Sequence, residues 1–439
     1  MLFVYNFIQI LVGTLSAPVL IGIAFLKSKY RRRTLDRLGF GLAGLRAKIS
    51  AGRPRIWIHA LSVGEVASSR ELVKQLRLKL PDAVILFSTT TRTGNDLARR
   101  DLAGHVDLFV PFPFDLFFVV NRFIQELDPD FFILVETDFW PNFLHRLQKK
   151  GKKALLVNGR FSAGSFQLYK RFRSLFLPAF EVFSVLSMQS REDAEKLVDF
   201  GVPEGKTVTL GNLKYETAIP AETGGTAGGR SDLHKYGIDG TDRLIWIAGS
   251  THEGEEEIIL SVYRNLLQKY PRLFLILAPR KVERGKEILQ LAGGQGLSAC
   301  RRSRPEQGGE DVLILDTLGE LAGLYGVCDF AFIGGSLVPQ RGHNPLEAAV
   351  HAKTVFFGPH MEDFSEISAD LIREKGAVVV RNKEELENFL NKLVQDENLR
   401  NEMGANASQL VLSHKGVLAA HLDLICNIIE QRNLDEKAS

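Results

Sequence analysis

The sequence predicts an α/β protein of two domains, each a parallel sheet covered by helices, behind an N-terminal helix that anchors the chain in a membrane. The chain has 439 residues, more than one ordinary hydrophobic core holds. Short apolar runs alternate with amphipathic stretches on both sides of a Gly- and Thr-rich segment, 219–231. Residues 2–26 carry no charged side chain.

Composition narrows the functional classes. Apolar residues make up 45% of the chain and charged residues 24%, which is typical of a globular protein. The net charge of +3 is nearly neutral, so general nucleic-acid binding is not indicated. The three cysteines, Cys300, Cys328 and Cys426, lie far apart and form no CxxC or Cys/His cluster. This spacing argues against a structural zinc site and a disulfide framework, and it indicates a reducing compartment.

The N-terminal apolar segment is long enough to cross a bilayer. As a helix, residues 2–26 would extend roughly 37 Å, against about 30 Å for the hydrocarbon core. Basic residues follow the segment at 27–33, so it differs from a cleaved signal peptide, and the positive-inside rule places the body of the protein in the cytoplasm. Asn6 and Gln9 weaken it as a membrane span, and the alternative is an amphipathic helix lying on the membrane. The basic run continues to Arg55 and suits an anionic membrane surface or an anionic, membrane-borne substrate.

Strands and helices alternate along both halves. Apolar runs predict strands first at 56–58, 83–87, 108–110, 131–135, 154–157 and 182–186, and then at 244–248, 273–277, 312–315, 330–333, 355–357 and 377–380. Helical stretches such as 66–80 and 117–127 separate them. The segment 219–231 has no apolar periodicity and is the predicted linker.

The predicted domains follow from this order. They are an anchor with its basic flank (1–30), a first Rossmann-like domain (31–220) and a second (221–439). Whether the last helix packs back on the first domain stays open. Two doubly wound domains joined by one linker are expected to leave a ligand-binding cleft between them.

A small-residue turn followed by a polar helix start predicts a nucleotide site in the second half. The turn 334–336 (GGS) follows the apolar run 330–333, and such a turn lets backbone N–H groups approach a phosphate. Asn344 suits the N-cap of the next helix, Pro345 its first position and Glu347 its third. Glu347 either caps this helix or accepts hydrogen bonds from ribose hydroxyls.

Two further strand ends carry polar residues in the second half. Ser250 and Thr251 follow a strand and suit a phosphate at a helix N-terminus, although the acids 255–257 would repel it if they faced it. Arg280 ends the next strand and serves either as a clamp for a phosphate or carboxylate or as a surface ion pair. His343 has no second His or Cys at ligand spacing, so no metal site is predicted there.

In the first half, Ser62 and Glu65 stand between a strand and a helix. Their spacing matches a capping box, with Ser62 as the N-cap and Glu65 at the third position. The functional alternative makes Glu65 a general base that takes a proton from an attacking hydroxyl. Spacing alone favours the cap.

Several other strand ends in the first half are polar. Thr91 lies in a Ser/Thr-rich loop, Glu136 and Asp138 follow one strand, and Asn158 and Arg160 follow another. Parallel strands bring such ends to one rim, so together they indicate a polar binding site. The chain has no Walker A motif, and no GxGxxG follows the first strand of either half, so ATP hydrolysis and dinucleotide binding have little support.

These motifs together resemble a known family. The sequence resembles the 3-deoxy-D-manno-octulosonic acid (Kdo) transferases, inner-membrane glycosyltransferases of lipopolysaccharide synthesis. The similar segments run in order over nearly the whole chain: WIHALSVGE (57–65), STTTRTG (88–94), PFPFD (111–115), ETDFWPN (136–142), NGRFS (158–162), GNLK (211–214), GSTHEGEE (249–256), APR (278–280), GGSLVPQRGHNPLEAA (334–349) and FGPHMEDF (357–364).

The resemblance implies a GT-B fold, with the acceptor bound mainly by the first domain and CMP-Kdo by the second. It implies an inverting transfer that needs no metal and no cofactor, with Glu65 as general base. The implied donor-binding residues are Ser250, Thr251, Arg280, Gly335, Ser336, Asn344 and Glu347. The implied acceptor or cleft residues are Ser62, Thr91, Glu136, Asp138, Asn158, Arg160 and Lys214, and Lys214 has no assigned role. The chain departs from the family pattern at Asp138, usually Glu, and at Arg341, usually Gly.

The resemblance also implies partners and location. The expected partners are CMP-Kdo, a lipid A precursor and an anionic phospholipid surface, with no nucleic acid. The expected location is the inner membrane, with the catalytic domains on its cytoplasmic face. Two alternatives remain: a GT-B enzyme that uses a UDP-sugar, and a membrane-anchored nucleotide-binding protein without catalysis.

Overall fold

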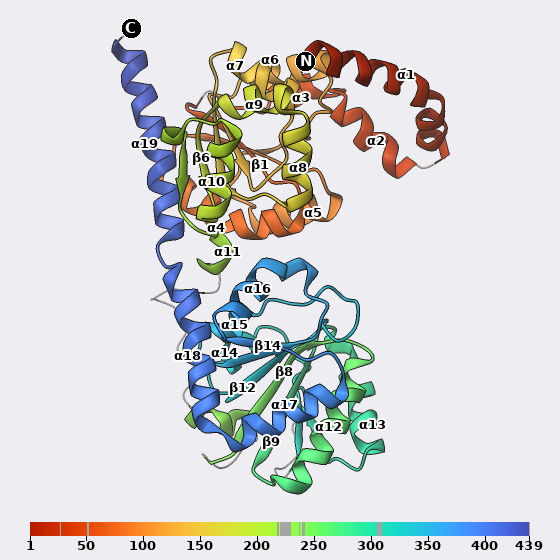
Figure 1. Cartoon of the computed structure of the whole chain (residues 1–439). Helices are drawn as coiled ribbons and strands as arrows, with labels where there is room; N and C mark the ends of the chain where they lie inside the picture. Colours follow the sequence, from red (N-terminus) through yellow and green to blue (C-terminus); the bar gives the residue numbers. More distant parts are fainter. Residues whose placement is uncertain are drawn as a thin grey trace. The chain divides into compact units, whose positions relative to one another are not determined.

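The chain folds into two compact units in its computed structural model (Figure 1). Described residues are 1–439 except 27, 51, 217, 218, 220–229, 237, 239–241, 305–309 and 439; the side chains of 16–30, 163, 230–232 and 433–438 are also not described. The first unit comprises Met1–Thr217 and Gly416–Ser439, and the second comprises Ala218–Lys415. The predicted boundary at 220/221 lies three residues beyond this division. Most of the predicted linker, 219–231, lies outside the described residues.

The first unit is built on a parallel sheet. Its described strands have the order β3-β2-β1-β4-β5-β6-β7. Their bounds are β1 (Arg55–His59), β2 (Val84–Ser88), β3 (Leu108–Phe109), β4 (Phe131–Val135), β5 (Lys153–Gly159), β6 (Phe183–Met188) and β7 (Thr207–Thr209). All six strands predicted in this half are confirmed. β7 was not predicted, because it is a short edge strand without an apolar run.

Helices cover both faces of this sheet. In chain order they are α1 (Leu2–Leu26), α2 (Ser28–Arg37), α3 (Leu42–Arg46), α4 (Val63–Lys79), α5 (Arg92–Asp101), α6 (Phe117–Leu127), α7 (Pro141–Lys149), α8 (Ala163–Arg171), α9 (Arg173–Glu181), α10 (Arg191–Phe200), the 3-10 helix η1 (Glu204–Lys206), α11 (Leu213–Glu216) and the last helix α19 (Val417–Ala438). The last helix contacts α4 and α11, so it belongs to the first unit.

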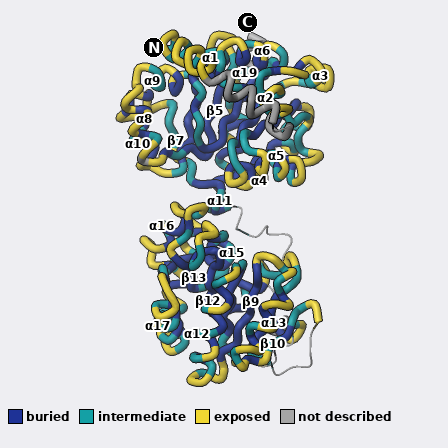
Figure 2. The backbone as a smooth tube through the Cα atoms, turned by 90° about the vertical axis from the view of Figure 1, so that its right-hand side faces the viewer, coloured by how far each residue is buried: buried dark blue, intermediate teal, exposed yellow. Residues whose placement is uncertain are grey.

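Burial on both faces explains the continuous apolar strands. In β1, Ile56 and Ile58 pack in the core with α4 and α19, and Trp57 packs on the opposite face with α6 and α7. Each such fully buried side chain contributes about 1.5–3 kcal/mol to folding. Figure 2 shows the strands of each unit as its buried layer, with most exposed residues on the helices.

The second unit repeats this architecture. Its described strands have the order β10-β11-β9-β8-β12-β13-β14, all parallel. Their bounds are β8 (Leu244–Thr251), β9 (Leu273–Pro279), β10 (Ala299–Arg301), β11 (Val312–Ile314), β12 (Phe330–Ile333), β13 (Thr354–Phe357) and β14 (Ala377–Val379). Its helices are η2 (Arg230–Tyr236), α12 (Glu255–Lys269), η3 (Val282–Arg284), α13 (Gly285–Gly294), α14 (Leu321–Leu324), α15 (Leu346–Ala349), η4 (Glu362–Phe364), α16 (Ser365–Arg373), α17 (Lys383–Gln395) and α18 (Glu397–Ser413).

The N-terminal segment is helical, and its polar residues contact the first unit. The Tyr5 hydroxyl donates to Asp115 Oδ2 at 3.0 Å, and Asn142 Nδ2 donates to Asn6 Oδ1 at 2.7 Å and to Gln9 Oε1 at 3.3 Å. These contacts account for the polar residues that weakened the segment as a membrane span. Among the described residues, no helix has both the length and the apolarity needed to cross a membrane.

Candidate functional site

In both sheets the order of the strands reverses beside the first strand of the unit. In the first unit, β2 and β3 lie on one side of β1 and β4 lies on the other. In the second unit, β8 likewise separates β9 from β12. The loops at the carboxyl ends of these central strands diverge, and such switch points are where open α/β sheets bind ligands.

Glu65 lies at the switch point of the first unit. It is buried in the first turn of α4, directly after the loop that follows β1. Its carboxylate accepts a hydrogen bond from the backbone N–H of Leu61. Ser62 occupies the N-cap position, but its hydroxyl caps no N–H of the helix and lies 3.4 Å from Glu65 Oε1. The predicted capping box is therefore wrong. The Glu65 carboxylate accepts the N–H of Leu61 rather than that of the N-cap residue Ser62, and the Ser62 hydroxyl accepts no N–H of the helix.

The surroundings of Glu65 favour its protonated form. Burial, and then the negative charge of Glu136, raise the pKa of Glu65 to about 8. Asp138 acts in the same direction, whereas the Leu61 N–H and the Lys214 ammonium act against it. A carboxyl group with a pKa near physiological pH can both take up and release a proton there, as a general base requires.

Glu136 contacts two of the other predicted residues, Arg160 and Lys214. It directly follows β4 and is almost fully buried. Arg160 Nε donates to Glu136 Oε2 at 2.9 Å, Lys214 Nζ lies 3.3 Å from Oε1, and the Ser68 hydroxyl donates to Oε1 at 3.3 Å. Two cations thus balance this carboxylate, and Glu136, Arg160, Lys214 and Glu65 form one charged cluster.

Asn158 and Thr91 serve the local backbone. Asn158 is fully buried, and its Oδ1 accepts the N–H of Leu213 at 2.9 Å, which holds the segment that carries Lys214. Thr91 is the N-cap of α5, where its hydroxyl accepts the N–H of Gly94 at 3.1 Å. Their predicted contacts with an acceptor stay predictions.

Backbone strain is concentrated at these strand ends. Eight non-glycine residues of the described chain have positive φ. Five of them lie in the predicted site segments: Glu136, Asp138, Asn158, Ser250 and Arg341. Such conformations are costly for residues with a Cβ and cluster at functional sites.

In the second unit, a buried carboxylate occupies the small-residue turn. The N–H groups of Gly335, Ser336 and Leu337 donate to Glu255 at 2.7, 2.9 and 2.9 Å. The N–H of His252 donates to the same carboxylate at 2.9 Å. Glu255 thus already accepts these N–H groups within the fold, and the predicted contact of the turn with a phosphate stays a prediction.

The small residues of this turn serve close packing. A Cβ at Gly334 would lie 2.4 Å from the Ser250 carbonyl oxygen, so only glycine fits between the ends of β8 and β12. Ser336 is fully buried, donates to the Ile333 carbonyl and accepts the Gly358 N–H at 2.8 Å. Its hydroxyl and N–H are therefore engaged within the fold, and its predicted contact with the donor stays a prediction.

The remaining predicted donor residues lie around Arg280. The exposed Arg280 follows β9. Burial, and then the charge of Arg280, lower the pKa of His252 and of His343. Burial raises the pKa of Glu347, and the charge of Arg280 opposes that rise. Helix α15 begins at Leu346 with Pro345 as its N-cap, so the predicted N-cap at Asn344 and first position at Pro345 are wrong by one residue. Asn344 Oδ1 nevertheless accepts the Leu346 N–H at 3.1 Å. Thr251 is buried and donates to Glu256 at 3.2 Å, so its hydroxyl faces the interior.

The fold brings together a histidine pair that sequence spacing did not reveal. His252 Nε2 and His343 Nε2 lie 2.8 Å apart, with their rings stacked at 5.1 Å. Burial, followed by the charge of Arg280, lowers the pKa of both, and that of His343 falls to about 4. Both imidazoles are therefore neutral at physiological pH. The sequence indicated only that each histidine follows a predicted strand.

Comparisons with known proteins agree with this architecture. Residues 32–217 match the family model described as 3-deoxy-D-manno-octulosonic-acid transferase (kdotransferase). The 3-deoxy-D-manno-octulosonic acid transferase of Haemophilus influenzae is 34% identical over 416 residues, which cover 94% of this chain and 95% of that protein. The protein of the same name from Rickettsia felis is 30% identical over 389 residues, 87% of this chain and 80% of that one.

Solved structures show the same fold at low identity. MurG of Acinetobacter baumannii has a TM-score of 0.53 at 12% identity, and it covers 85% of this chain and all of its own. A UDP-N-acetylglucosamine 2-epimerase has a TM-score of 0.54 at 11% identity, with 85% and 96% covered. The two parallel-sheet domains are thus those of GT-B proteins, and the family resemblance is confirmed: the chain belongs to the 3-deoxy-D-manno-octulosonic acid transferase family of glycosyltransferases.

Proposed function

We propose that this enzyme transfers Kdo from CMP-Kdo to a lipid A precursor during lipopolysaccharide synthesis, with release of CMP. A hydroxyl of the acceptor attacks the anomeric carbon of Kdo from the face opposite the nucleotide. The new carbon–oxygen bond forms, the bond from that carbon to the CMP phosphate oxygen breaks, and Glu65 takes the hydroxyl proton. Family membership supports Kdo as the transferred sugar.

One observation carries the role of Glu65. It is a buried carboxyl group at the switch point of its sheet, with a pKa raised to about 8. As the hydroxyl attacks, its proton needs an acceptor of matched basicity, which this carboxylate supplies better than an ordinary exposed one. Lys214 and Arg160 partly offset the negative charge of Glu136, and so limit how far that neighbour raises the pKa of Glu65.

The leaving nucleotide requires positive charge. Negative charge develops on the CMP phosphate as the glycosidic bond breaks, and a positioned guanidinium stabilises it. Arg280 is the proposed partner, supported by its exposure and by its electrostatic effect on His252, His343 and Glu347. Asn344 and Glu347, at the start of α15, lie in the same electrostatic neighbourhood and are proposed to orient the donor.

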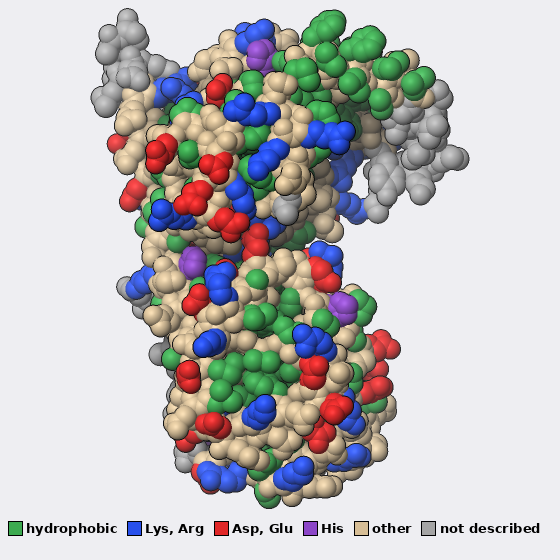
Figure 3. Space-filling view, in the orientation of Figure 1, with side chains coloured by type: hydrophobic (Ala, Val, Ile, Leu, Met, Phe, Trp, Pro, Cys, Tyr) green, Lys and Arg blue, Asp and Glu red, His purple; other side chains and the backbone are tan. Residues whose placement is uncertain are grey.

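We also propose that α1 holds the enzyme on the cytoplasmic face of the inner membrane. Four of its exposed apolar residues recur every four positions along one face of the helix, Phe3, Phe7, Leu11 and Leu15, and the exposed Val4, Ile8 and Val12 form the adjacent row. Hydrophobic side chains gather on this helix in Figure 3. Exposed apolar side chains gathered on one helix are typical of a membrane contact. Vesicle flotation of a Phe3→Ser/Phe7→Ser variant tests the proposal, which predicts loss of membrane binding; undiminished flotation would contradict it.

Transfer with purified substrates tests the function. Wild type and Glu65→Gln are incubated with freshly made CMP-Kdo and a lipid A precursor, and CMP binding is measured in parallel. Product from wild type, and at least a hundredfold less from a variant that still binds CMP, is the expected result. Undiminished transfer by the variant would remove Glu65 from the mechanism. No product from wild type with CMP-Kdo, but product with a UDP-sugar, would replace the proposed donor.

A further inference from the structure

The first unit contains a cavity that the proposed transfer step does not use. Its volume is about 430 Å³, within the usual range of about 300–1,000 Å³ for small-ligand sites. Helix α2 forms one wall, the first turns of α5 a second, and the chain after β3 a third. All lining residues belong to the first unit.

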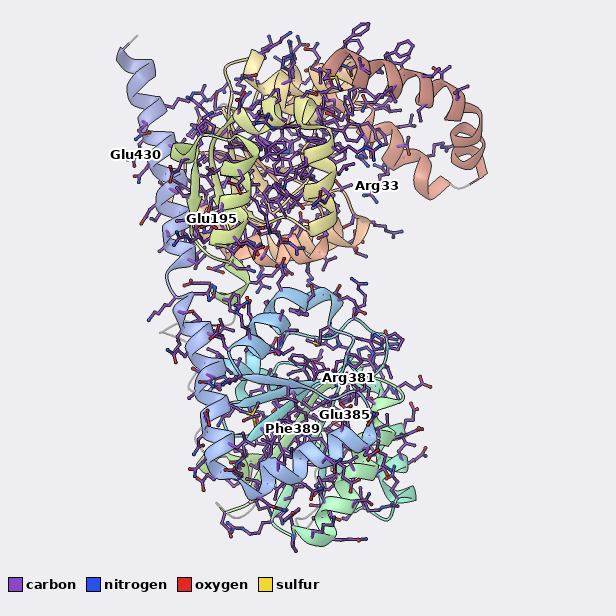
Figure 4. The ribbon with its side chains drawn as sticks, in the orientation of Figure 1. Arg33, Glu195, Arg381, Glu385, Phe389 and Glu430 are labelled. Carbon is purple, nitrogen blue, oxygen red and sulfur yellow. The ribbon has the colours of Figure 1, made fainter. Side chains whose placement is uncertain are left out.

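The cavity is strongly basic. It is lined by one acid, Asp36, and by five arginines: Arg32, Arg33, Arg37, Arg92 and Arg99. Figure 4 labels Arg33, which lies between α2 and the body of the first unit. Arg92 pairs with Asp96 at 3.7 Å on the exposed surface of α5. Within the described part of the chain, Arg33, Arg37 and Arg99 form no ion pair with a carboxylate.

Neutral groups orient two of these arginines. Arg37 Nε donates to the Phe112 carbonyl at 3.0 Å, and its guanidinium lies 4.1 Å from the centroid of the Phe114 ring. Arg99 Nε donates to Asn95 Oδ1 at 2.8 Å, and its guanidinium lies 4.9 Å from the Phe109 ring. Burial and the charge of Arg33 lower the pKa of Arg37 to about 10. These contacts position the guanidinium groups without neutralising their charge, so they stay available to pair with an anion in the cavity.

The cavity adjoins the loop that holds Glu65. Thr91, in the cavity wall, donates its backbone N–H to the Leu61 carbonyl at 3.0 Å. The N–H of Leu61 in turn donates to the Glu65 carboxylate. The backbone of Leu61 therefore links the cavity wall to the proposed base through two hydrogen bonds.

We propose that this cavity binds the phosphomonoester of a phosphorylated sugar in the glycolipid acceptor, and so presents the acceptor hydroxyl to Glu65. A phosphomonoester carries up to two negative charges and three acceptor oxygens, which match several guanidinium forks better than a single carboxylate does. The wall helix α2 follows directly on α1, whose apolar face is proposed to meet the membrane, so a membrane-borne ligand is favoured. This inference rests on the proposed function.

Direct binding tests the cavity without requiring turnover. Calorimetry on the full chain compares a water-soluble phosphorylated glucosamine disaccharide with the same disaccharide after phosphatase treatment. Wild type is expected to bind the phosphorylated form about tenfold tighter or more, and Arg33→Gln and Arg99→Gln are expected to lose this preference. Arg100→Gln is the matched control, because Arg100 lies on the same helix, outside the cavity wall, with a 74% exposed side chain.

Each outcome decides between the sources of the anion. An unchanged phosphate preference in both variants would overturn the proposal. Equally tight binding of inorganic phosphate would show that the sugar plays no part, and a loss confined to anionic phospholipid vesicles would assign the arginines to the membrane surface; both contradict the proposal. If wild type prefers the phosphorylated disaccharide but transfers no Kdo, the proposed function fails while the cavity assignment stands. In transfer assays, both variants should raise the acceptor KM about tenfold and leave kcat near wild type.

Discussion

We expect the charge of Glu136 to set the pH at which Kdo transfer reaches half its maximal rate. With a pKa of about 8, Glu65 is ionised in roughly 9% of molecules at pH 7 and about 90% at pH 9, so kcat should rise about tenfold between them. Glu136→Gln removes the charge that ranks second, after burial, in raising this pKa. It also releases Lys214 and Arg160 from their carboxylate partner. Both effects lower the pKa of Glu65.

The midpoint of the alkaline rise should therefore fall in Glu136→Gln, yet stay above 4.5 because burial is unchanged. A fall of one pH unit would raise the ionised fraction at pH 7 to about 50%, roughly a fivefold gain. The assay is kcat for Kdo transfer at saturating acceptor from pH 5 to 10, with the midpoint rather than the maximal rate as the readout. Glu71→Gln, on the outer side of the same helix, is the control. A wild-type midpoint near 4.5, or one that Glu136→Gln leaves in place, would refute the reasoning.

Three other perturbations test the same framework. Lys214→Met should move the midpoint of kcat to higher pH, because the ammonium lowers the pKa of Glu65; a shift to lower pH would contradict this. Glu255→Gln should cost about 3 kcal/mol in the unfolding free energy of the second unit by urea titration, while the exposed Glu257→Gln costs little; equal effects would refute the buried role of Glu255. Burial lowers the pKa of His421 in the folded protein to about 4. As pH falls, His421 is therefore protonated in the unfolded chain before it is protonated in the folded protein, so the free energy of unfolding should decrease between about pH 6.5 and pH 4. His421→Gln should flatten that part of the stability profile, and an unchanged slope would argue against it.

The local pattern of apolar residues was sufficient to predict most strands of the two sheets. Each of the strands predicted from apolar runs is present, because a strand buried on both faces must be apolar throughout. The two strands that were not predicted, β7 and β10, lie at sheet edges and have three residues each. An edge strand pairs on one side only, so tertiary contact rather than its own composition defines it.

Long-range contacts decided the chemistry. The sequence placed Glu65 after a strand and showed the family, but only the fold brings Glu136, from another strand, near enough to raise its pKa. The Gly-rich turn showed that N–H groups would be exposed to an anion, and the fold filled that position with Glu255, about 80 residues earlier in the chain. Local sequence determines which groups are available for bonding, whereas burial and the partner that arrives from elsewhere in the chain determine their charge state and their ligand.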